Sequence, residues 1–256
     1  MPKAFSITLW FDDALEAIRF LTILKLPLRN IHPESALAHS MFFFPAVGIL
    51  IGFVSLWIFY LAEHAFPSRI ANLFLLIAPI IISGGLHVDG FADFCDGFFG
   101  GKTKSDILRI MKDSNVGAWG ALGVTLLMLV KFELLLALPE KAPYFLLAMA
   151  ASRCAQVFFC FYLPYAGMGG GVSERVAGKT GLREVLGAAL FLIPFIFWLR
   201  MEAIYIVGGL TLFLILLGSF YKRRIGGVTG DLLGAASELT EVCVLLIALS
   251  GAHSHV

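Results

Sequence analysis

The sequence predicts an all-α integral membrane protein: a polytopic helix bundle with about seven transmembrane helices and an amphipathic helix at its N-terminus. Of the 256 residues, 59% are hydrophobic and only 14% are charged, and the mean hydropathy is +0.89. A soluble domain of this length would carry more charged residues. Its apolar runs would also stop short of the roughly 18 to 20 residues that cross the hydrocarbon layer. Backbone polar groups in lipid must be satisfied within their own segment, so spans this apolar are predicted to be helices.

The first 30 residues are expected to contain an amphipathic helix. Trp10, Ala14 and Ile18 share one helical face, while Asp12 and other charged residues lie on the rest of the surface. A helix of this kind lies in the membrane interface or packs against the bundle. Pro27 is expected to end it, because proline cannot donate the backbone hydrogen bond that a continuing helix needs.

Seven apolar segments follow and are the predicted spans. They cover residues 42–62, 70–86, 118–138, 142–163, 184–199, 203–220 and 232–251. The second and the fifth are short, so we expect them to tilt little or to be partly re-entrant. No repeat and no soluble domain is evident between them, and residues 1–256 are predicted to form a single transmembrane domain.

The distribution of lysine and arginine predicts the orientation. With the N-terminus inside, the inner segments hold four of these residues in 1–29, four in 102–112, three in 175–183 and three in 222–224. The outer connections hold only Arg69, Lys141 and Arg200. Such a bias is typical of cytoplasmic segments. We therefore expect a protein of the cytoplasmic (inner) membrane whose N-terminus and Gly-rich segments face the cytoplasm.

The segment 84–117 carries the predicted active site. Asp89, Asp93 and Asp96 follow one another at i, i+4 and i+7, which places their carboxylates within about 60° on one helix face. Three like charges so close together would repel one another. A divalent cation relieves that repulsion, and Mg²⁺ suits hard carboxylate oxygens while taking its other ligands from water and phosphate. We expect these residues to hold Mg²⁺; the alternatives are a solvated acidic helix end and an ion path in a transporter.

Glycines and cations directly after the aspartates indicate phosphate binding. Gly100 and Gly101 could present backbone N–H groups to an anion. The cations that are candidates for binding the phosphates of a substrate are Lys102, Lys104, Arg109, Lys112 and Arg224. Taken singly, the lysines are also explained by membrane topology alone. Taken with the acidic residues, the group predicts chemistry on a diphosphate.

The last span adds a second acidic stripe, in which Asp231, Glu238 and Glu241 share a helix face. Asp231 lies at the inner end and is a further candidate for binding substrate. Glu238 lies about 10 Å further along the helix than Asp231, at a depth where a carboxylate is costly unless it is paired or functional. Arg153 is expected to pair with Glu238 or Glu241 as a structural brace, whereas Lys131 is expected to snorkel toward the surface.

Three residues are candidates for the base that accepts a proton from an attacking hydroxyl: His87, Asp113 and Glu238. His87 precedes the first aspartate of the acidic segment by two residues, and histidine is the side chain whose ordinary pKa lies nearest neutrality. Asp113 could instead join the metal shell or cap the start of a helix.

Five stretches of the sequence resemble the cobalamin synthase family, the adenosylcobinamide-GDP ribazoletransferases. They are AIRFLTILKLP (17–27), FFFPAVGILIG (42–52), HVDGFADFCDG (87–97), IMKDSNVGAWG (110–120) and GGVTGDLLGAASELTE (226–241). The resemblance extends over nearly the whole chain, and its H-x-D-G-x-x-D-x-x-D-G core is specific.

The resemblance implies a membrane-embedded, Mg²⁺-dependent enzyme of the last assembly steps of the adenosylcobalamin nucleotide loop. Its substrates would be adenosylcobinamide-GDP and α-ribazole or α-ribazole 5′-phosphate, and the ribazole 3′-hydroxyl would attack the cobinamide-linked phosphorus and expel GMP. The metal-binding role falls to Asp89, Asp93 and Asp96, and Asp113 and Asp231 occupy other motif positions. The lipid bilayer is an expected partner, a second copy of the chain and enzymes of the pathway are further partners considered, and no nucleic acid is expected.

Two other functions fit parts of the sequence less well. The CDP-alcohol phosphotransferases carry the motif D-x2-D-G-x2-A-R-x8-G-x3-D-x3-D, which begins here at Asp93 and Asp96 but then fails, since Ser114 and Ala118 stand where the later aspartates belong. A cation transporter would use the acidic stripes as its path. Transporter sites tend to lie near the bilayer midplane, whereas these carboxylates are grouped at the inner edge beside cations.

Overall fold

The computed structural model describes residues 7–27, 36–169 and 172–253, and every regular element within these ranges is helical. The helices are α1 (Ile7–Leu21), α2 (Ala36–Ser40), the 3₁₀ helix η1 (Met41–Phe43), α3 (Phe44–Glu63), α4 (Ser68–Ile82), α5 (Leu86–Gly100), α6 (Lys104–Met111), α7 (Ala118–Ala137), α8 (Lys141–Tyr162), the 3₁₀ helix η2 (Val172–Arg175), α9 (Leu182–Leu190), α10 (Ile193–Leu199), α11 (Glu202–Ile225) and α12 (Gly230–His253). The prediction of an all-α polytopic bundle is therefore confirmed.

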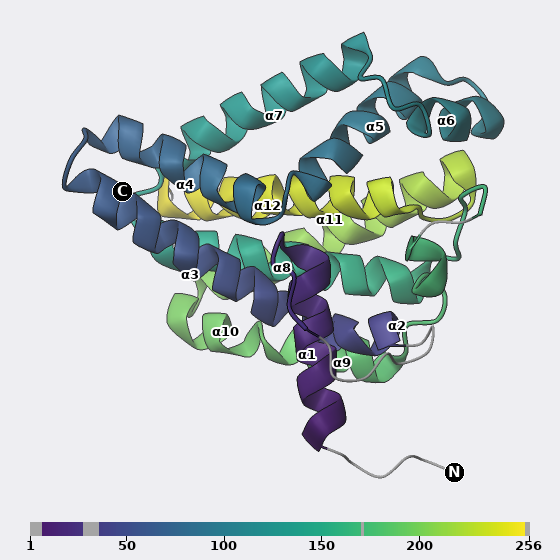
Figure 1. Ribbon diagram of the computed structural model, residues 1–256. Coiled ribbons are helices and arrows are strands. Elements are labelled where there is room, and N and C mark those ends of the chain that lie inside the picture. Colours follow the sequence, from purple (N-terminus) through teal and green to yellow (C-terminus); the bar gives the residue numbers. More distant parts are fainter. Residues whose placement is uncertain (1–6, 28–35, 170–171, 254–256) are drawn as a thin grey trace.

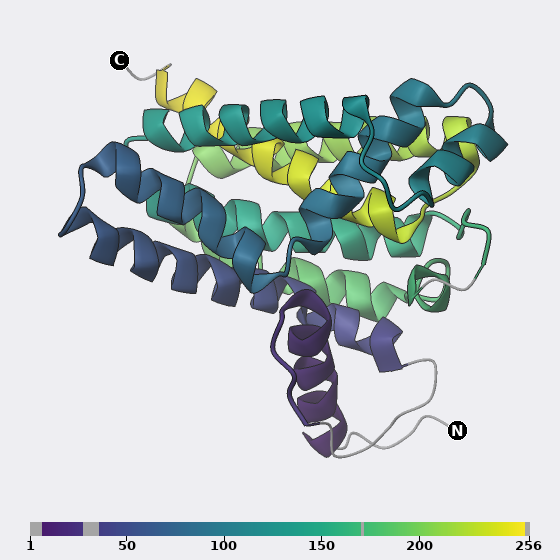
Figure 2. The same cartoon turned by 45° about the horizontal axis from the view of Figure 1, so that its top comes forward.

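The long helices run roughly along one direction, with α8 and α12 in the interior and the others around them (Figures 1 and 2). In the most apolar stretch of 18 residues in each helix, 83% of the residues of α8 are buried inside the molecule, whereas only 22% of those of α11 are. Because the exposed side chains of α11 between Ile204 and Phe220 are nearly all apolar, this part of its outer surface suits lipid and not water. Six segments are long and apolar enough to cross a membrane, and the bent pair of α4 and α5 makes a seventh.

The second predicted span is broken, in line with its shortness. α4 and α5 meet at an angle of 88°, and the turn between them contains Gly84 and Gly85 with φ of 65° and 75°. Side chains other than glycine rarely adopt this left-handed backbone. The paired glycines thus let the chain turn sharply, so that α5 leaves the direction of α4 and crosses the first half of α12 (Figure 1).

Glycines also set how closely α5 approaches its neighbours. A Cβ on Gly90 would lie 2.7 Å from the backbone oxygen of Asp231 on α12, and one on Gly120 would lie 2.4 Å from the carboxylate of Asp96. Contacts this short leave no room for a side chain, so α5 can lie directly against α12 on one side and α7 on the other. Small residues serve helix packing in membranes in this way.

The N-terminal amphipathic helix is present but shorter than expected. α1 ends at Leu21, six residues before Pro27, because the Ile23 N–H donates to the oxygen of Ile82 at the end of α4 and not to an oxygen within α1. Residues 1–6 and 28–30 of the predicted segment lie outside the described residues. Figure 2 shows α1 standing across the direction of the other helices.

A buried ion network crosses the middle of the bundle. The guanidinium of Arg153 lies 2.6 Å from Glu241, which confirms the predicted pairing, and the amine of Lys131 lies 2.8 Å from Glu238 and 2.5 Å from Glu241. The prediction that Lys131 snorkels is wrong, since its side chain is only 7% exposed. Two cations and two carboxylates neutralise one another, which is how charged groups are tolerated at this depth.

Candidate active site

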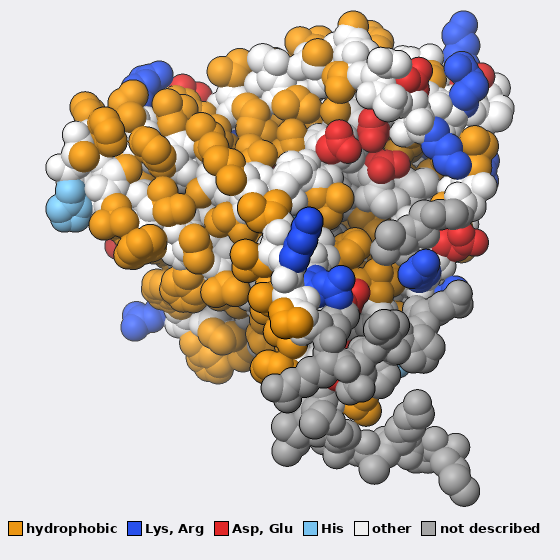
Figure 3. Space-filling model, in the orientation of Figure 1, with side chains coloured by type: hydrophobic (Ala, Val, Ile, Leu, Met, Phe, Trp, Pro, Cys, Tyr) orange, Lys and Arg blue, Asp and Glu red, His pale blue; other side chains and the backbone are white. Residues whose placement is uncertain are grey.

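One end of the bundle gathers the Gly-rich segments that the sequence placed on a common side (Figure 1). A cavity of about 450 Å³ opens there. Its lining comes from α5, α6, α8 and the segment after it, from the start of α12, and from α1, α2, η1 and α3. That segment and the start of α12 are held together by backbone hydrogen bonds from Val228 N–H to Pro164 and from Ala166 N–H to Val228. On the surface, acidic side chains cluster at this end with lysines and arginines beside them, next to a mainly hydrophobic face (Figure 3).

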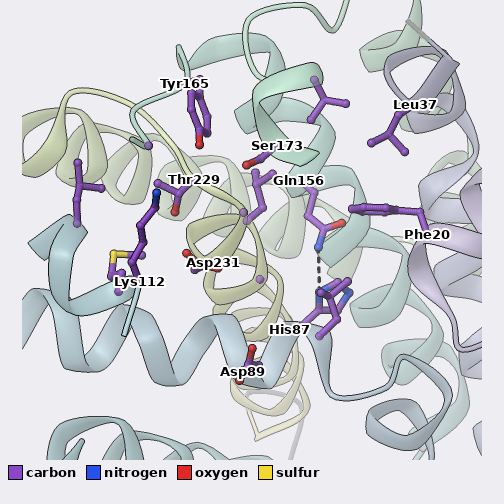
Figure 4. Close-up of a pocket in the computed structure, with 18 of the residues that line it drawn as sticks. Phe20, Leu37, His87, Asp89, Lys112, Gln156, Tyr165, Ser173, Thr229 and Asp231 are labelled. Atoms are coloured by element: carbon purple, nitrogen blue, oxygen red, sulfur yellow. Dashed lines mark hydrogen bonds between the residues drawn. The ribbon is translucent and has the colours of Figure 1, made fainter. Parts of the chain in front are cut away.

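Asp89 and Asp231 line this cavity from two different helices. Asp89 lies on α5 and Asp231 lies in the first turn of α12 (Figure 4). The close contacts made at Gly90, and at Gly234 against the backbone of His87, fix the separation of the two helices. Residues 142 positions apart in sequence thus present carboxylates to one space.

Asp93 lies one turn further along α5 and is partly buried. It experiences repulsion from Asp231, Asp89 and Asp96. Unpaired carboxylates close together are unfavourable, and a cation among them relieves the repulsion. The electrostatic situation predicted from the sequence is therefore present at Asp89 and Asp93, with Asp231 as an additional member.

Asp96 has a different environment from the other two aspartates of α5. Its side chain is buried against the start of α7, where its two oxygens accept hydrogen bonds from the N–H groups of Gly117 (2.7 Å) and Gly120 (2.8 Å). The first N–H groups of a helix have no partner within the helix, and a carboxylate there also interacts favourably with the helix dipole. In this structure Asp96 anchors α7 to α5 and does not face the cavity with Asp89.

The donor set at the cavity suits magnesium. Among the described residues, no three His, Cys, Asp or Glu side chains stand close enough to form a complete metal site by themselves. Mg²⁺ does not need such a cage, since proteins commonly hold it through one or two carboxylates, with water and substrate phosphates as the remaining ligands. Asp89 and Asp93, on successive turns of α5, supply carboxylate oxygens of the required kind.

Of the predicted phosphate-binding cations, Lys112 lines the cavity. Lys102, Lys104 and Arg109 are exposed nearby on α6 and the turn before it. Arg224 has a packing contact instead, because its guanidinium donates to the backbone oxygens of Phe98 (3.1 Å) and Gly101 (3.3 Å) at the end of α5. The expected anion-binding turn at Gly100 and Gly101 is not formed, because the N–H of Gly101 donates to Gly97 within the helix end.

The three candidate bases lie in three different environments. His87 is buried and lines the cavity. Asp113 is exposed, and hydrogen bonds from the backbone and side chain of Asn115 lower its pKa below the usual range, which makes it a weaker proton acceptor. Asp113 also does not cap α7, because the N–H groups at the start of that helix donate to Asp96. Glu238 belongs to the ion network with Lys131.

Sequence reasoning missed Gln156. This residue lies on α8, is 3% exposed, lines the cavity, and places its side-chain nitrogen 3.4 Å from Nδ1 of His87. The available signal was its position, since an amide side chain within an otherwise apolar span is costly unless it has a partner.

Fold and site together define a polytopic membrane protein with a carboxylate-bearing cavity at one end of its helix bundle. The family model described as cobalamin-5-phosphate synthase matches residues 13–249. Similar chains include an adenosylcobinamide-GDP ribazoletransferase from Chlorobaculum tepidum, 37% identical over 238 residues that cover 91% of this chain and 92% of the relative. Others with the same name come from Shewanella frigidimarina, 36% identical with 91% and 92% covered, and Ralstonia pickettii, 35% identical with 90% and 91% covered.

This chain belongs to the cobalamin-5-phosphate synthase family and is an enzyme of that kind. No solved structure matches it. The resemblance predicted from the sequence motifs is confirmed.

Proposed function

We propose that this protein transfers adenosylcobinamide phosphate from adenosylcobinamide-GDP to α-ribazole or α-ribazole 5′-phosphate and releases GMP. The observation that supports it most is a cavity lined by Asp89, Asp231 and Lys112, in a chain of this family. The names of the relatives specify the substrates. This family match favours the proposal over the CDP-alcohol phosphotransferase and transporter alternatives.

In the proposed reaction, the ribazole hydroxyl oxygen forms a bond to the phosphorus next to the cobinamide. The bond between that phosphorus and the bridging diphosphate oxygen breaks, and GMP leaves with that oxygen. Asp231 is our candidate for accepting the hydroxyl proton, because it lines the cavity from α12, whereas Asp89 lines it from α5. Lys112, which directly follows α6, would bind a phosphate oxygen of the substrate. Holding the two substrates together in one site would account for much of the rate acceleration.

We assign the Mg²⁺ ion of the proposed reaction to Asp89 and Asp93. When bound there, the ion would offset the negative charge of the diphosphate and of the departing phosphate. Repulsion of Asp93 by Asp231 and Asp89, which line the cavity, supports a cation at this position. Asp96 is left out of this assignment, because both of its oxygens are already engaged by α7.

The size of the cavity limits what it encloses. At about 450 Å³ it is typical of pockets that enclose a ligand of drug size. A nucleoside and a phosphate are of this size, whereas the corrinoid ring with its side chains is much larger. The corrinoid would therefore remain outside, over the end of the bundle.

We assign this end of the bundle to the cytoplasmic side of the inner membrane. The support is the excess of lysine and arginine in segments 102–112, 175–183 and 222–224. The variants Lys102→Cys and Lys141→Cys test the assignment when each carries the introduced residue as its single cysteine. In intact cells, the cysteine at position 141 should react with a membrane-impermeant reagent and the cysteine at position 102 should not. A second copy of the chain and enzymes of the pathway stay predicted partners.

The proposed function is tested with purified protein in lipid, adenosylcobinamide-GDP, α-ribazole and Mg²⁺. We expect GMP and a cobalamin product in equal amounts. Turnover should stop when the metal is removed with EDTA and should recover when Mg²⁺ is added back. Folded protein that releases no GMP from these substrates would refute the proposal. Turnover that persists in EDTA would refute the metal assignment alone.

A further inference from the structure

A buried pair of polar side chains interrupts the apolar wall of the cavity. His87 on α5 and Gln156 on α8 are each 3% exposed and both line the cavity. They are joined by one long hydrogen bond of 3.4 Å between the side-chain nitrogen of Gln156 and Nδ1 of His87 (Figure 4).

Each member of this pair retains one polar atom without a partner. Among the described residues, neither Nε2 of His87 nor Oε1 of Gln156 has a hydrogen-bond partner. Leaving a buried polar atom unpaired is costly, so such atoms in native proteins usually meet water or a ligand. Two such atoms, on neighbouring residues that both line a cavity, are the arrangement expected of a ligand contact.

The geometry also indicates which atom donates. The amide nitrogen of Gln156 faces Nδ1 of His87, so Nδ1 accepts and the ring proton lies on Nε2. His87 therefore has an unpaired N–H donor, and Gln156 has an unpaired carbonyl acceptor. A histidine in this form is suited to binding an acceptor atom of a ligand.

The two ends of the cavity differ in chemistry. Asp231 and Lys112 lie at one end, whereas Phe20 and Leu37 lie on the side of the His87–Gln156 pair (Figure 4). Phe44 also lines the cavity and stacks on Phe20. The charged end suits a phosphate. The apolar end suits a flat heteroaromatic ring with few polar atoms, because such a ring buries apolar surface and needs few hydrogen bonds.

We propose that His87 and Gln156 recognise the base of the acceptor nucleoside, with the N–H of His87 donating to the base's free ring nitrogen. The inference rests on the proposed function, in which the acceptor is α-ribazole, a benzimidazole nucleoside. One ring nitrogen of that base is bonded to ribose and the other is a hydrogen-bond acceptor. Gln156 acts as a positioning residue that fixes the His87 tautomer, and its free oxygen accepts from a ribose hydroxyl.

The test compares two acceptors: α-ribazole and the matching indole riboside, in which C–H replaces the free ring nitrogen. In the parent, this replacement should lower kcat/KM about tenfold, the effect of one hydrogen bond in a buried site. In His87→Phe the two acceptors should be used within about twofold of one another, and Gln156→Leu should fall between parent and His87→Phe. The KM for adenosylcobinamide-GDP should change less than about twofold in both variants.

Asn72→Leu is the matched control. Asn72 is a fully buried amide on α4 whose side-chain oxygen also lacks a partner, but it does not line the cavity. It should keep the parent's preference between the two acceptors. If His87→Phe fails to fold, the comparison of acceptors on the parent and on Gln156→Leu still decides the question.

The outcomes separate this inference from the proposed function. A parent that forms product equally well from both acceptors, or a Gln156→Leu variant with the parent's full preference, overturns the inference and leaves the proposed function intact. A folded parent that forms no product from α-ribazole overturns the proposed function, on which the inference rests.

Discussion

Replacement of Asp96 tests whether this residue supports the fold or binds metal. Its two oxygens accept N–H groups at 2.7 and 2.8 Å, and the side chain is buried. Hydrogen bonds to a charged group contribute roughly 1.5–3 kcal/mol each, so Asp96→Ala should lose about 3–6 kcal/mol of unfolding free energy. Asp96→Asn keeps one acceptor oxygen and should lose about half as much. For a chain of this size, a loss of 3–6 kcal/mol corresponds to a fall in Tm on the order of 10 °C.

The assay is thermal unfolding of the purified variants in the same lipid, without and with Mg²⁺. Asp93→Asn is the matched control, because it neutralises a carboxylate on the same helix that experiences repulsion from Asp231 and Asp89. It should keep or raise the Tm without Mg²⁺ and lose the Mg²⁺-dependent activity. An Asp96→Asn variant with the parent's Tm and no Mg²⁺-dependent activity would refute the reasoning, since it would make Asp96 a metal ligand.

Three further predictions follow from contacts elsewhere in the molecule. Arg153→Met should lower the unfolding free energy by about 3–5 kcal/mol, because it leaves Glu241 in the buried network with less positive charge; a Tm equal to the parent's would contradict the role as a brace. Gly90→Ala should reduce GMP release at least tenfold by forcing α5 away from α12, whereas Gly208→Ala, whose added Cβ meets no atom within 4 Å, should not. Hydrogen bonds from the hydroxyl and backbone N–H of Thr103, the N-cap of α6, lower the pKa of Asp106, so the ionised Asp106 should stabilise α6 at neutral pH. Acidification that protonates Asp106 should remove this stabilisation. Amide exchange in α6 should therefore rise at low pH, and in Asp106→Asn it should already be raised at neutral pH.

The spans were predictable because the membrane imposes a simple requirement. Apolar length and the positions of lysine and arginine located the helices and grouped the segments at a common end, without knowledge of any contact. The break between α4 and α5 was harder to locate, because residues 70–86 are continuously apolar and only Gly84 and Gly85 mark the turn. A pair of glycines within a helix is compatible with either a straight or a broken span.

The candidate site was predictable only in part. Helical spacing placed Asp89, Asp93 and Asp96 on one face, but it could not indicate that α7 covers the end of that face and engages Asp96. The pairing of Lys131 with Glu238 joins residues 107 positions apart, so local spacing could not predict it either. Patterns within one helix describe which residues share a face, and the packing of other helices decides what each residue contacts.

The most direct test of the account is the rate of GMP release by Asp231→Asn at saturating Mg²⁺. Glu133→Gln serves as the control, since Glu133 is an exposed carboxylate toward the other end of α7 whose side chain is 66% exposed. If chemistry on the diphosphate takes place between α5 and α12, Asp231→Asn should unfold at the parent's Tm or above and release GMP at least about 100-fold more slowly, while Glu133→Gln matches the parent. A folded Asp231→Asn variant that releases GMP at the parent's rate would contradict the account.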